Sequence, residues 1–284
     1  MDGRILICLT AFLILGARCR AAEVFYMDHD GFTEQYVGPV GPLVISGEIE
    51  PGDYDHLLAK IQNDEKRFFA GNKILLVSDG GDVAEAMRIG TLIKSIFTEV
   101  IVGTQTGRCV SACFLIYASA QQRATEGTHV IGINRPYWVD PSPFMGAAGA
   151  PAPNSQPAIA NLLKQVRDFL QDNEVPPHLI EEMFRHPSDD AYWLSPDDEN
   201  ELGYRSKALS RYLAQKCDWD ATLESDVYAG NRPLSDLRQA WKCRANTTSA
   251  DARKALLAAL QAKSAPEPAA RSSSSRKSAG VQTH

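Results

Sequence analysis

Residues 74–97 read ILLVSDGGDVAEAMRIGTLIKSIF, and this stretch decides the fold class. Its first four residues, Ile74–Val77, form a continuous apolar run that is typical of a fully buried strand. The next segment, Ser78–Asp82, contains a double glycine, and Val83–Phe97 then repeats apolar side chains with the period of a helix. The stretch predicts a buried strand that ends in a glycine turn and leads directly into a helix.

Similar segments lie on both sides of this stretch. Strands are predicted at Leu43–Ile49, Glu99–Val102 and Thr128–Ile133, and helices at Tyr54–Phe69 and Cys109–Ala120. The polar segment Ala124–Gly127 is interpreted as a turn. Strands that alternate with helices along the chain indicate an α/β fold with a largely parallel sheet.

The second half of the chain predicts a different organisation. Helices are expected at Ile159–Asp172, Pro177–Phe184 and Pro196–Leu202, the last one capped by Gly203. Residues 139–157, rich in Pro, Gly and Ala, are expected to form a mobile loop. We expect one domain over 23–210, a small helical segment over 211–262, and a tail over 263–284 that is too polar to fold.

The N-terminus has the pattern of a secretory signal peptide. Arg4 precedes the apolar run Ile5–Gly16, and small residues end at Ala22. We therefore expect residues 1–22 to be a signal peptide and the mature protein to be periplasmic or secreted. An uncleaved membrane anchor is the alternative, although the apolar run is shorter than the roughly 20 residues that span a bilayer. Contact with a membrane is expected only through this segment.

Composition and cysteine spacing exclude some classes of function and favour others. The net charge of −6, without a clustered basic patch, argues against nucleic acid as a partner. No His/Cys cluster has metal-ligand spacing, so neither a metal nor another cofactor is expected. An even number of cysteines in an exported protein indicates disulfides, and Cys217 and Cys243 are the natural pair. Cys109 and Cys113 could be small buried residues, since a bridge between them within one regular helix would be strained.

Three motifs with potential chemistry follow one another along the chain. The double glycine Gly80-Gly81 opens one helix, and Ser111 lies between Cys109 and Cys113 at the start of another. The strand that ends in Ile133-Asn134-Arg135-Pro136 follows, and Asp190 then precedes Leu194-Ser195. Taken alone, Ser111 could be a simple helix cap and the glycines a tight turn.

Taken together, this ordered set resembles the Clp protease/crotonase superfamily over roughly residues 43–206. It is most similar to a branch of exported bacterial proteins with a Cys-x-Ser-Ala-Cys motif. The resemblance implies a spiral of repeated β-β-α units, here with a small disulfide-linked C-terminal appendage. It also implies self-association, because the family assembles into rings through a helical arm that residues 157–186 resemble.

The resemblance also implies roles for individual residues. Ser111 occupies the position of the nucleophile, and the backbone N–H groups of Gly81 and Ala112 occupy the positions of the oxyanion hole. Asn134 stands where the family has its histidine base, and an asparagine cannot take a proton from serine at neutral pH. Asp190 stands one residue from the position of the family's aspartate. His186, close to Asp190 in sequence, is the candidate for a substitute base.

Two hypotheses therefore follow from the sequence. In the first, the chain is an exported serine peptidase or hydrolase with Ser111 as nucleophile and an unusual base. In the second, it is a catalytically inactive member of the family that binds a peptide or a protein. A peptide or protein is the expected partner in both.

Overall fold

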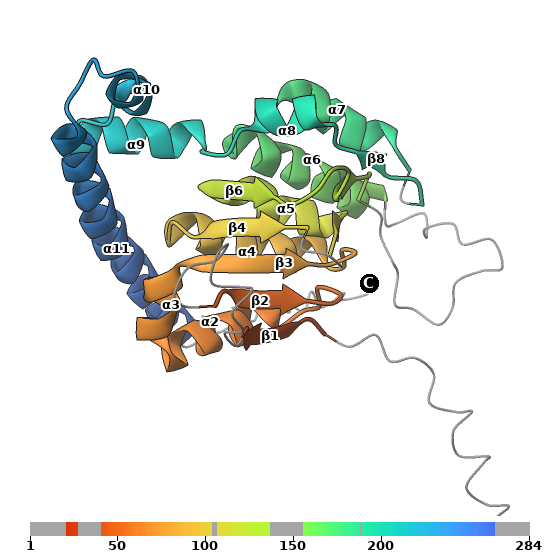
Figure 1. The fold of residues 1–284 in the computed structure, drawn as a ribbon. Helices are drawn as coiled ribbons and strands as arrows, with labels where there is room; N and C mark the ends of the chain where they lie inside the picture. The colour runs from red at the N-terminus through yellow and green to blue at the C-terminus, as the bar shows by residue number, and fades with distance from the viewer. Residues whose placement is uncertain (1–20, 28–40, 104–106, 137–155, 188, 265–284) are drawn as a thin grey trace, which may run out of the picture.

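The computed structural model describes residues 21–27, 41–103, 107–136, 156–187 and 189–264. Nearly all of the predicted signal peptide, the predicted loop at 139–157 and the predicted tail at 263–284 lie outside the described residues. The chain has a mixed α/β structure built on two sheets (Figure 1).

The larger sheet has five strands in the order β1-β2-β3-β4-β6. Its strands are β1 (Glu23–Tyr26), β2 (Leu43–Ser46), β3 (Lys73–Val77), β4 (Glu99–Val102) and β6 (Gln122–Thr125). The edge strand β1 is antiparallel to β2, and the other neighbours are parallel. The predicted parallel sheet is thus confirmed, with an antiparallel strand at its edge.

A smaller sheet lies at the carboxyl ends of these strands. It contains β5 (Cys109–Val110), β7 (Ile131–Ile133) and β8 (Tyr192–Trp193). Two isolated parallel bridges, Ile49 to Gly81 and Ser78 to Cys109, extend the same layer toward β2 and β3. After leaving the large sheet, the chain therefore passes through a second short extended segment before each of the helices α2, α4 and α5.

The described helices lie mainly on one side of the large sheet and beyond its β6 edge (Figure 1). They are α2 (Asp53–Asn63), α3 (Glu65–Gly71), α4 (Val83–Ser95), α5 (Ala112–Ser119), α6 (Gln156–Asp172), α7 (Pro177–Arg185), α8 (Pro196–Leu202), α9 (Lys207–Cys217), α10 (Leu223–Tyr228) and α11 (Leu234–Ser264). None of them is long and apolar enough to cross a membrane.

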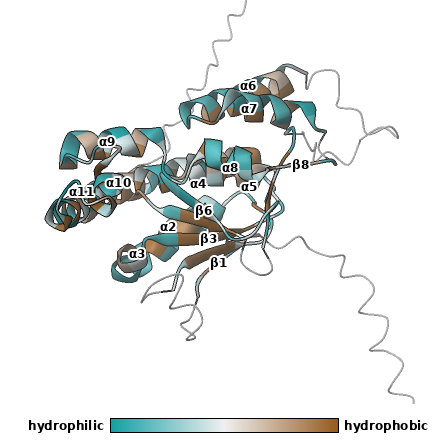
Figure 2. Cartoon of the chain, turned by 45° about the horizontal axis from the view of Figure 1, so that its top comes forward, coloured by the Kyte–Doolittle hydropathy of each residue, from teal (hydrophilic) through white to brown (hydrophobic). Residues whose placement is uncertain are grey.

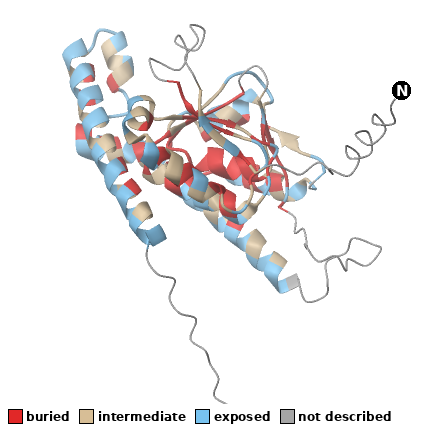
Figure 3. Cartoon of the chain, turned by 90° about the horizontal axis from the view of Figure 1, so that it is seen from below, coloured by how far each residue is buried: buried red, intermediate tan, exposed pale blue. Residues whose placement is uncertain are grey.

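The core lies between the large sheet and its helices. Ile74 and Leu76 of β3 face the main cluster, whereas Leu75 faces a small cluster on the other side of the sheet. All three side chains are buried, as the continuous apolar run predicts. Figure 2 shows the apolar residues along the strands and polar residues on the outer helix faces, and Figure 3 shows the buried residues gathered in the middle of the molecule.

Three predicted segments are wrong in detail. The predicted helix Cys109–Ala120 begins only at Ala112, because Cys109–Val110 pairs with β7 as a strand. The predicted turn at Ala124–Gly127 begins inside strand β6. The predicted helix Tyr54–Phe69 is two helices, since Asp64 leaves the helical conformation and its side chain accepts the N–H of Arg67.

The C-terminal helices form a small cluster of their own around Trp219, to which α9, α10 and α11 contribute. The predicted disulfide between Cys217 and Cys243 joins α9 to α11 and is confirmed. Helix α11 is 31 residues long, and its second half returns to the main core through Ala252 and Leu256. The C-terminal helices are therefore fastened to the rest of the fold at both ends.

A buried carboxylate organises the start of α8. Asp198 accepts hydrogen bonds from the Ser195 N–H at 2.9 Å, the Ser195 hydroxyl at 2.7 Å and the Tyr192 hydroxyl at 2.9 Å. The Nε2 atom of His178 lies 3.1 Å from its other oxygen. Burial alone would raise the pKa of Asp198, but these hydrogen bonds hold that pKa below its ordinary value.

The lowered pKa of Asp198 predicts a pH dependence of stability. The carboxylate stabilises the fold above its unfolded pKa of about 3.9, and the contribution disappears as pH falls through the lower folded pKa. We expect Asp198→Asn to reduce the free energy of unfolding by about 1–2 kcal/mol at pH 7 and by much less at pH 2–3. Denaturant titrations across this range measure it, with the exposed neighbour Asp197→Asn as control. A loss that does not change with pH would contradict the prediction.

Candidate functional site around Ser111

Ser111 lies at the junction between β5 and α5 with an unusual backbone conformation. Its φ is 58° and its ψ is −124°, and its side chain makes no capping hydrogen bond to the helix. The simple helix-cap interpretation of Ser111 is therefore wrong. A non-glycine residue in a sparsely populated backbone region costs about 1–3 kcal/mol and persists only where its surroundings enforce it. Strained strand-to-helix turns of this kind expose nucleophilic serines in hydrolases.

Hydrogen bonds on both sides of β5 enforce this conformation. The N–H of Val110 donates to the carbonyl of Ser78 at 2.9 Å, and the N–H of Ser111 donates to the carbonyl of Gly132 at 3.0 Å. Immediately afterwards, the Ser111 carbonyl accepts the N–H of Phe114 at 3.0 Å, which starts the helix. The backbone must therefore turn from strand to helix within the single residue Ser111.

A disulfide closes around this turn. Cys109 and Cys113 are bridged, with a Cα–Cα distance of 5.3 Å, and both residues are fully buried. The geometric objection to this bridge assumed that both residues lie on one helix. Cys109 lies on β5 and Cys113 in the first turn of α5, so the objection does not apply. The bridge links the residues on either side of Ser111 and restricts the turn further.

The double glycine packs directly against Ser111. A Cβ atom at Gly80 would lie 2.8 Å from the Cβ of Ser111, and one at Gly81 would lie 2.1 Å from the carbonyl oxygen of Ile49. Both glycines also have positive φ, 114° and 133°. Only glycine fits at these two positions, because a side chain would meet both an unfavourable φ and a neighbouring atom.

Two backbone N–H groups near Ser111 are available for a ligand. The bridge to Ile49 uses the carbonyl of Gly80 and the N–H of Asp82, and it leaves the N–H of Gly81 on the other side of the chain. Ala112 is the first residue of α5, so its N–H has no acceptor within the helix. These are the two N–H groups for which the resemblance implies an oxyanion hole.

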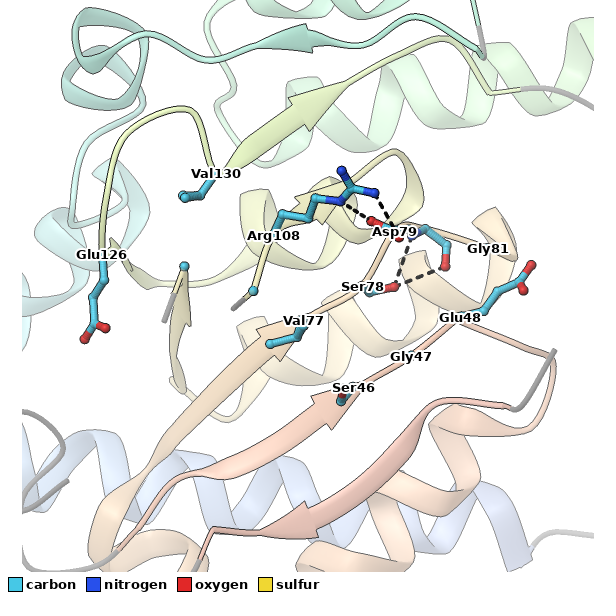
Figure 4. A pocket seen from close by; sticks show the side chains of 13 residues that line it. Ser46, Gly47, Glu48, Val77, Ser78, Asp79, Gly81, Arg108, Glu126 and Val130 are labelled. Carbon is cyan, nitrogen blue, oxygen red and sulfur yellow. Dashed lines mark hydrogen bonds and ion pairs between the residues drawn. The ribbon is translucent and has the colours of Figure 1, made fainter. Parts of the chain in front are cut away.

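A groove of about 1030 Å³ runs along the carboxyl ends of the parallel strands (Figure 4). Its walls include Ser46–Glu48 after β2, Val77–Gly81 after β3, and Gly103 after β4. The carboxyl edge is where open parallel sheets bind their ligands. Arg108 spans the groove's wall and holds Asp79 with two hydrogen bonds, of 2.5 and 3.2 Å. This pair ties the glycine turn to the segment that leads into Ser111.

The expected base and its aspartate are absent from the strands beside Ser111. Asn134 follows β7 and is only 5% exposed. The register Ile133 to Tyr192 places Ala191 opposite Asn134 when the pairing of β7 and β8 is continued by one residue. Asp190 is one residue further on, and its side chain is 72% exposed. Because side chains alternate between the faces of a strand, a shift of one residue turns the carboxylate away from the face that Asn134 occupies.

His186 lies beside this strand end. Its carbonyl accepts the N–H of Arg135 at 2.9 Å, which brings the histidine next to the segment containing Asn134. Its ring nitrogens lie 3.5 Å from a Glu182 oxygen and 3.7 Å from an Asp190 oxygen. The structure thus gathers His186 and Asp190 near Asn134. The Ser111 hydroxyl makes no hydrogen bond to any residue that the structure describes.

Two features of the site were not predicted from the sequence. The Asp79–Arg108 pair joins residues 29 positions apart, and neither has a local pattern that reveals its partner. The face of the strand on which Ala191 lies could have been predicted, because strand alternation places it on the same face as Trp193. The described residues contain no cluster of His, Cys, Asp and Glu that could hold a metal ion.

Comparison with known proteins gives distant structural matches. No protein-family model and no curated protein matches the chain. Among solved structures, a variant of the 1510-N membrane-bound stomatin-specific protease matches with 20% identity and a TM-score of 0.41, covering 62% of this chain and 83% of that one.

Two further matches are Clp proteases. ClpP1 from Listeria monocytogenes is 20% identical with a TM-score of 0.38, covering 57% of this chain and 86% of that one. The ClpP catalytic domain from Plasmodium falciparum is 18% identical with a TM-score of 0.35, covering 57% and 82%. Identities this low do not show that this chain shares the activity of any of the three proteins.

The contact between Gly80 and Ser111 predicts the effect of a single methyl group. Gly80→Ala combines a positive φ with a collision against Ser111, whereas Gly52→Ala has a similar φ of 109° and no atom within 4 Å of the new methyl group. We expect Gly52→Ala to lower the free energy of unfolding by about 1 kcal/mol and Gly80→Ala by at least twice as much. Urea titration measures both, and equal losses would contradict the contact.

Proposed function

We propose that this chain is an exported, Clp-protease-like serine hydrolase that acts on peptides, with Ser111 as the nucleophile. The conformation of Ser111 is the single observation that carries the proposal. Ser111 has a strained backbone, lies within the Cys109–Cys113 disulfide loop, packs against Gly80 and makes no capping hydrogen bond. For structure alone, alanine would serve equally well at this position. The Cys-x-Ser-Ala-Cys motif and the implied β-β-α spiral belong to the same proposal.

The mechanism follows from the groups around Ser111. A peptide that extends from the groove past Gly80 and Gly81 to Ser111 would place its carbonyl carbon at the Ser111 Oγ. The oxygen would then accept hydrogen bonds from the N–H groups of Gly81 and Ala112. Each such donor is worth about 2.7–4 kcal/mol in the transition state. The N-terminal end of α5 adds the positive end of a helix dipole, which favours the developing negative charge.

His186 is the proposed base, since the usual histidine position holds Asn134. The proton of the Ser111 hydroxyl would pass to His186 directly or through one water, and then to the leaving amine. Glu182 and Asp190, each within 3.7 Å of a ring nitrogen, would stabilise the protonated ring. In this proposal His186 takes the role of the usual histidine, and Asp190 of the neighbouring turn stabilises its protonated ring.

A second function is favoured by one specific observation. The buried Asn134 and the methyl group of Ala191 occupy the two strand positions where a histidine and an aspartate would complete the relay. If His186 does not reach Ser111, the pocket can hold a peptide carbonyl or carboxylate without cleaving anything. The chain is then a peptide- or protein-binding module.

Export and self-association belong to this proposal as well. Both cysteine pairs are disulfides, and disulfides form and persist in oxidising compartments, which supports a periplasmic or secreted location. Helices α6 and α7 pack together beyond the β6 edge of the sheet, where they could contact a second copy (Figure 1).

Reaction with a fluorophosphonate probe distinguishes the two functions. We expect the wild-type protein to be labelled at Ser111, Ser111→Ala to be unlabelled, and His186→Gln to react about 10²–10⁴-fold more slowly, since that is the usual contribution of a general base. Peptide mapping by mass spectrometry identifies the labelled residue.

A double variant supplies the matched control. Asn134→His with Ala191→Asp places a histidine and an aspartate on the strand positions that face each other. Labelling of this variant but not of the wild type would contradict the hydrolase and support the binding module. Absence of labelling in both would contradict the assignment of Ser111 as a nucleophile in either form.

A further inference from the structure

A buried carboxylate lies beneath the N-terminal segment of the described chain. Asp53, the first residue of α2, is 1% exposed. Its Oδ2 accepts the N–H of Glu50 at 2.8 Å and the N–H of Ala22 at 3.3 Å. Its Oδ1 is buried and has no hydrogen-bond partner among the described residues. Burying a carboxylate with so few hydrogen bonds costs free energy, because the group has lost its hydration.

No cationic side chain among the described residues hydrogen-bonds to Asp53. The Nδ1 of His56 lies 3.7 Å from Oδ1, but this ring is 68% exposed and is charged only when protonated. Glu85 of α4 approaches the same turn and accepts the N–H groups of Gly52 and Tyr54. Arg88 is already paired with Glu85 at 2.7 Å. The turn therefore holds two buried carboxylates and one arginine, and no cationic side chain of the described ranges pairs closely with Asp53.

The backbone N–H of Ala22 points toward the carboxylate of Asp53. The residue is 5% exposed and belongs to the main core, and its neighbour Ala21 pairs with Glu48. The sequence before it reads Cys19-Arg20-Ala21, with small residues one and three positions before the Ala21–Ala22 bond. This is the small-x-small pattern at which signal peptides are cut, whereas a cut after Ala22 would put Arg20 in the outer position.

We propose that processing cuts the bond between Ala21 and Ala22, and that the new α-ammonium of Ala22 forms a buried ion pair with Asp53. The predicted signal peptide then ends one residue earlier, at Ala21. This inference rests on the proposed export of the chain and not on any activity of Ser111.

The chemistry of the cut supplies a positive charge. An endopeptidase of the export machinery adds one water across the Ala21–Ala22 amide. The carbonyl carbon of Ala21 becomes a carboxylate and leaves with the signal peptide, while the nitrogen of Ala22 becomes an ammonium group. A single amide donor is thereby replaced by three donors and a positive charge. These donors can serve both Asp53 oxygens, including the buried Oδ1.

The ion pair is connected to the candidate site through one short segment. Asp53 also holds the N–H of Glu50, and the neighbouring Ile49 donates to the carbonyl of Gly80 at 2.8 Å and accepts the N–H of Asp82 at 2.7 Å. Fixing Asp53 therefore fixes the strand segment on which the double glycine rests. Processing stabilises the turn that lies against Ser111.

The first test is the mature N-terminus. The full chain is expressed with its own signal in a bacterial host, and the exported protein is analysed by N-terminal sequencing and intact mass. We expect the sequence to begin at Ala22. A mature protein that begins at any other residue, or that keeps the full N-terminus, would overturn the proposed cut.

The second test is a double-mutant cycle on the ion pair. It compares the mature chain with one that begins at Ala21, each with and without Asp53→Asn. Either change should raise the unfolding equilibrium constant about 10–100-fold at pH 6, and the two together should add little to either alone, because both remove the same interaction. Asp55→Asn, in the same helix turn, is the control and should be additive with the extension.

The pH dependence has a defined sign. An ammonium paired with a carboxylate has a folded pKa above its unfolded value of about 7.7–8.0. The stabilisation is therefore complete below that value and is lost as pH rises through the folded pKa. Additive effects of the extension and Asp53→Asn would overturn the ion pair even if the cut is correct. Neither test involves Ser111, so the absence of hydrolase activity leaves both results interpretable.

Discussion

The arrangement of the site depends on a backbone that must change from strand to helix within one residue. Ser111 donates its N–H to β7 and its carbonyl starts α5, and its φ in this turn is 58°. The disulfide between Cys109 and Cys113 joins the two residues that flank this change. The Ser111 hydroxyl makes no capping hydrogen bond to the helix.

The two-layer sheet explains why the groups of the site converge. Each parallel strand continues past the large sheet into the smaller layer, where Gly81, Ser78 and Cys109 take part in adjacent bridges. The double glycine comes from one strand and Ser111 from the next, and they meet because the layer packs their backbones without intervening side chains. The groove along the same carboxyl edge is lined by both glycines of this meeting point (Figure 4). The fold thus brings Ser111 and the double glycine together through backbone geometry alone.

The sequence predicted those elements whose patterns are local. The apolar run at Ile74–Val77 and the following glycines identified the strand, the turn and the helix α4 without further information. The start of α5 was missed because every side chain of this helix is buried, so the apolar pattern has no period that marks where it begins. Strand β6 was missed because the guanidinium of Arg123 is buried against the carbonyls of Ala118, Leu202 and Gly203, partners that its own surroundings in the sequence do not reveal. The position of His186 relative to Ser111 could not be predicted for the same reason, because long-range packing decides the distance between them.

We propose that Ser111 acts as a nucleophile beside the backbone N–H groups of Gly81 and Ala112. A crystal structure of the mature protein soaked with a peptide boronic acid tests this most directly. We expect φ near +60° at Ser111, a covalent bond from its Oγ to boron, and a boronate oxygen about 2.7–3.1 Å from the N–H groups of Gly81 and Ala112. A Ser111 with negative φ whose hydroxyl caps α5, with no electron density for the boronate, would contradict it.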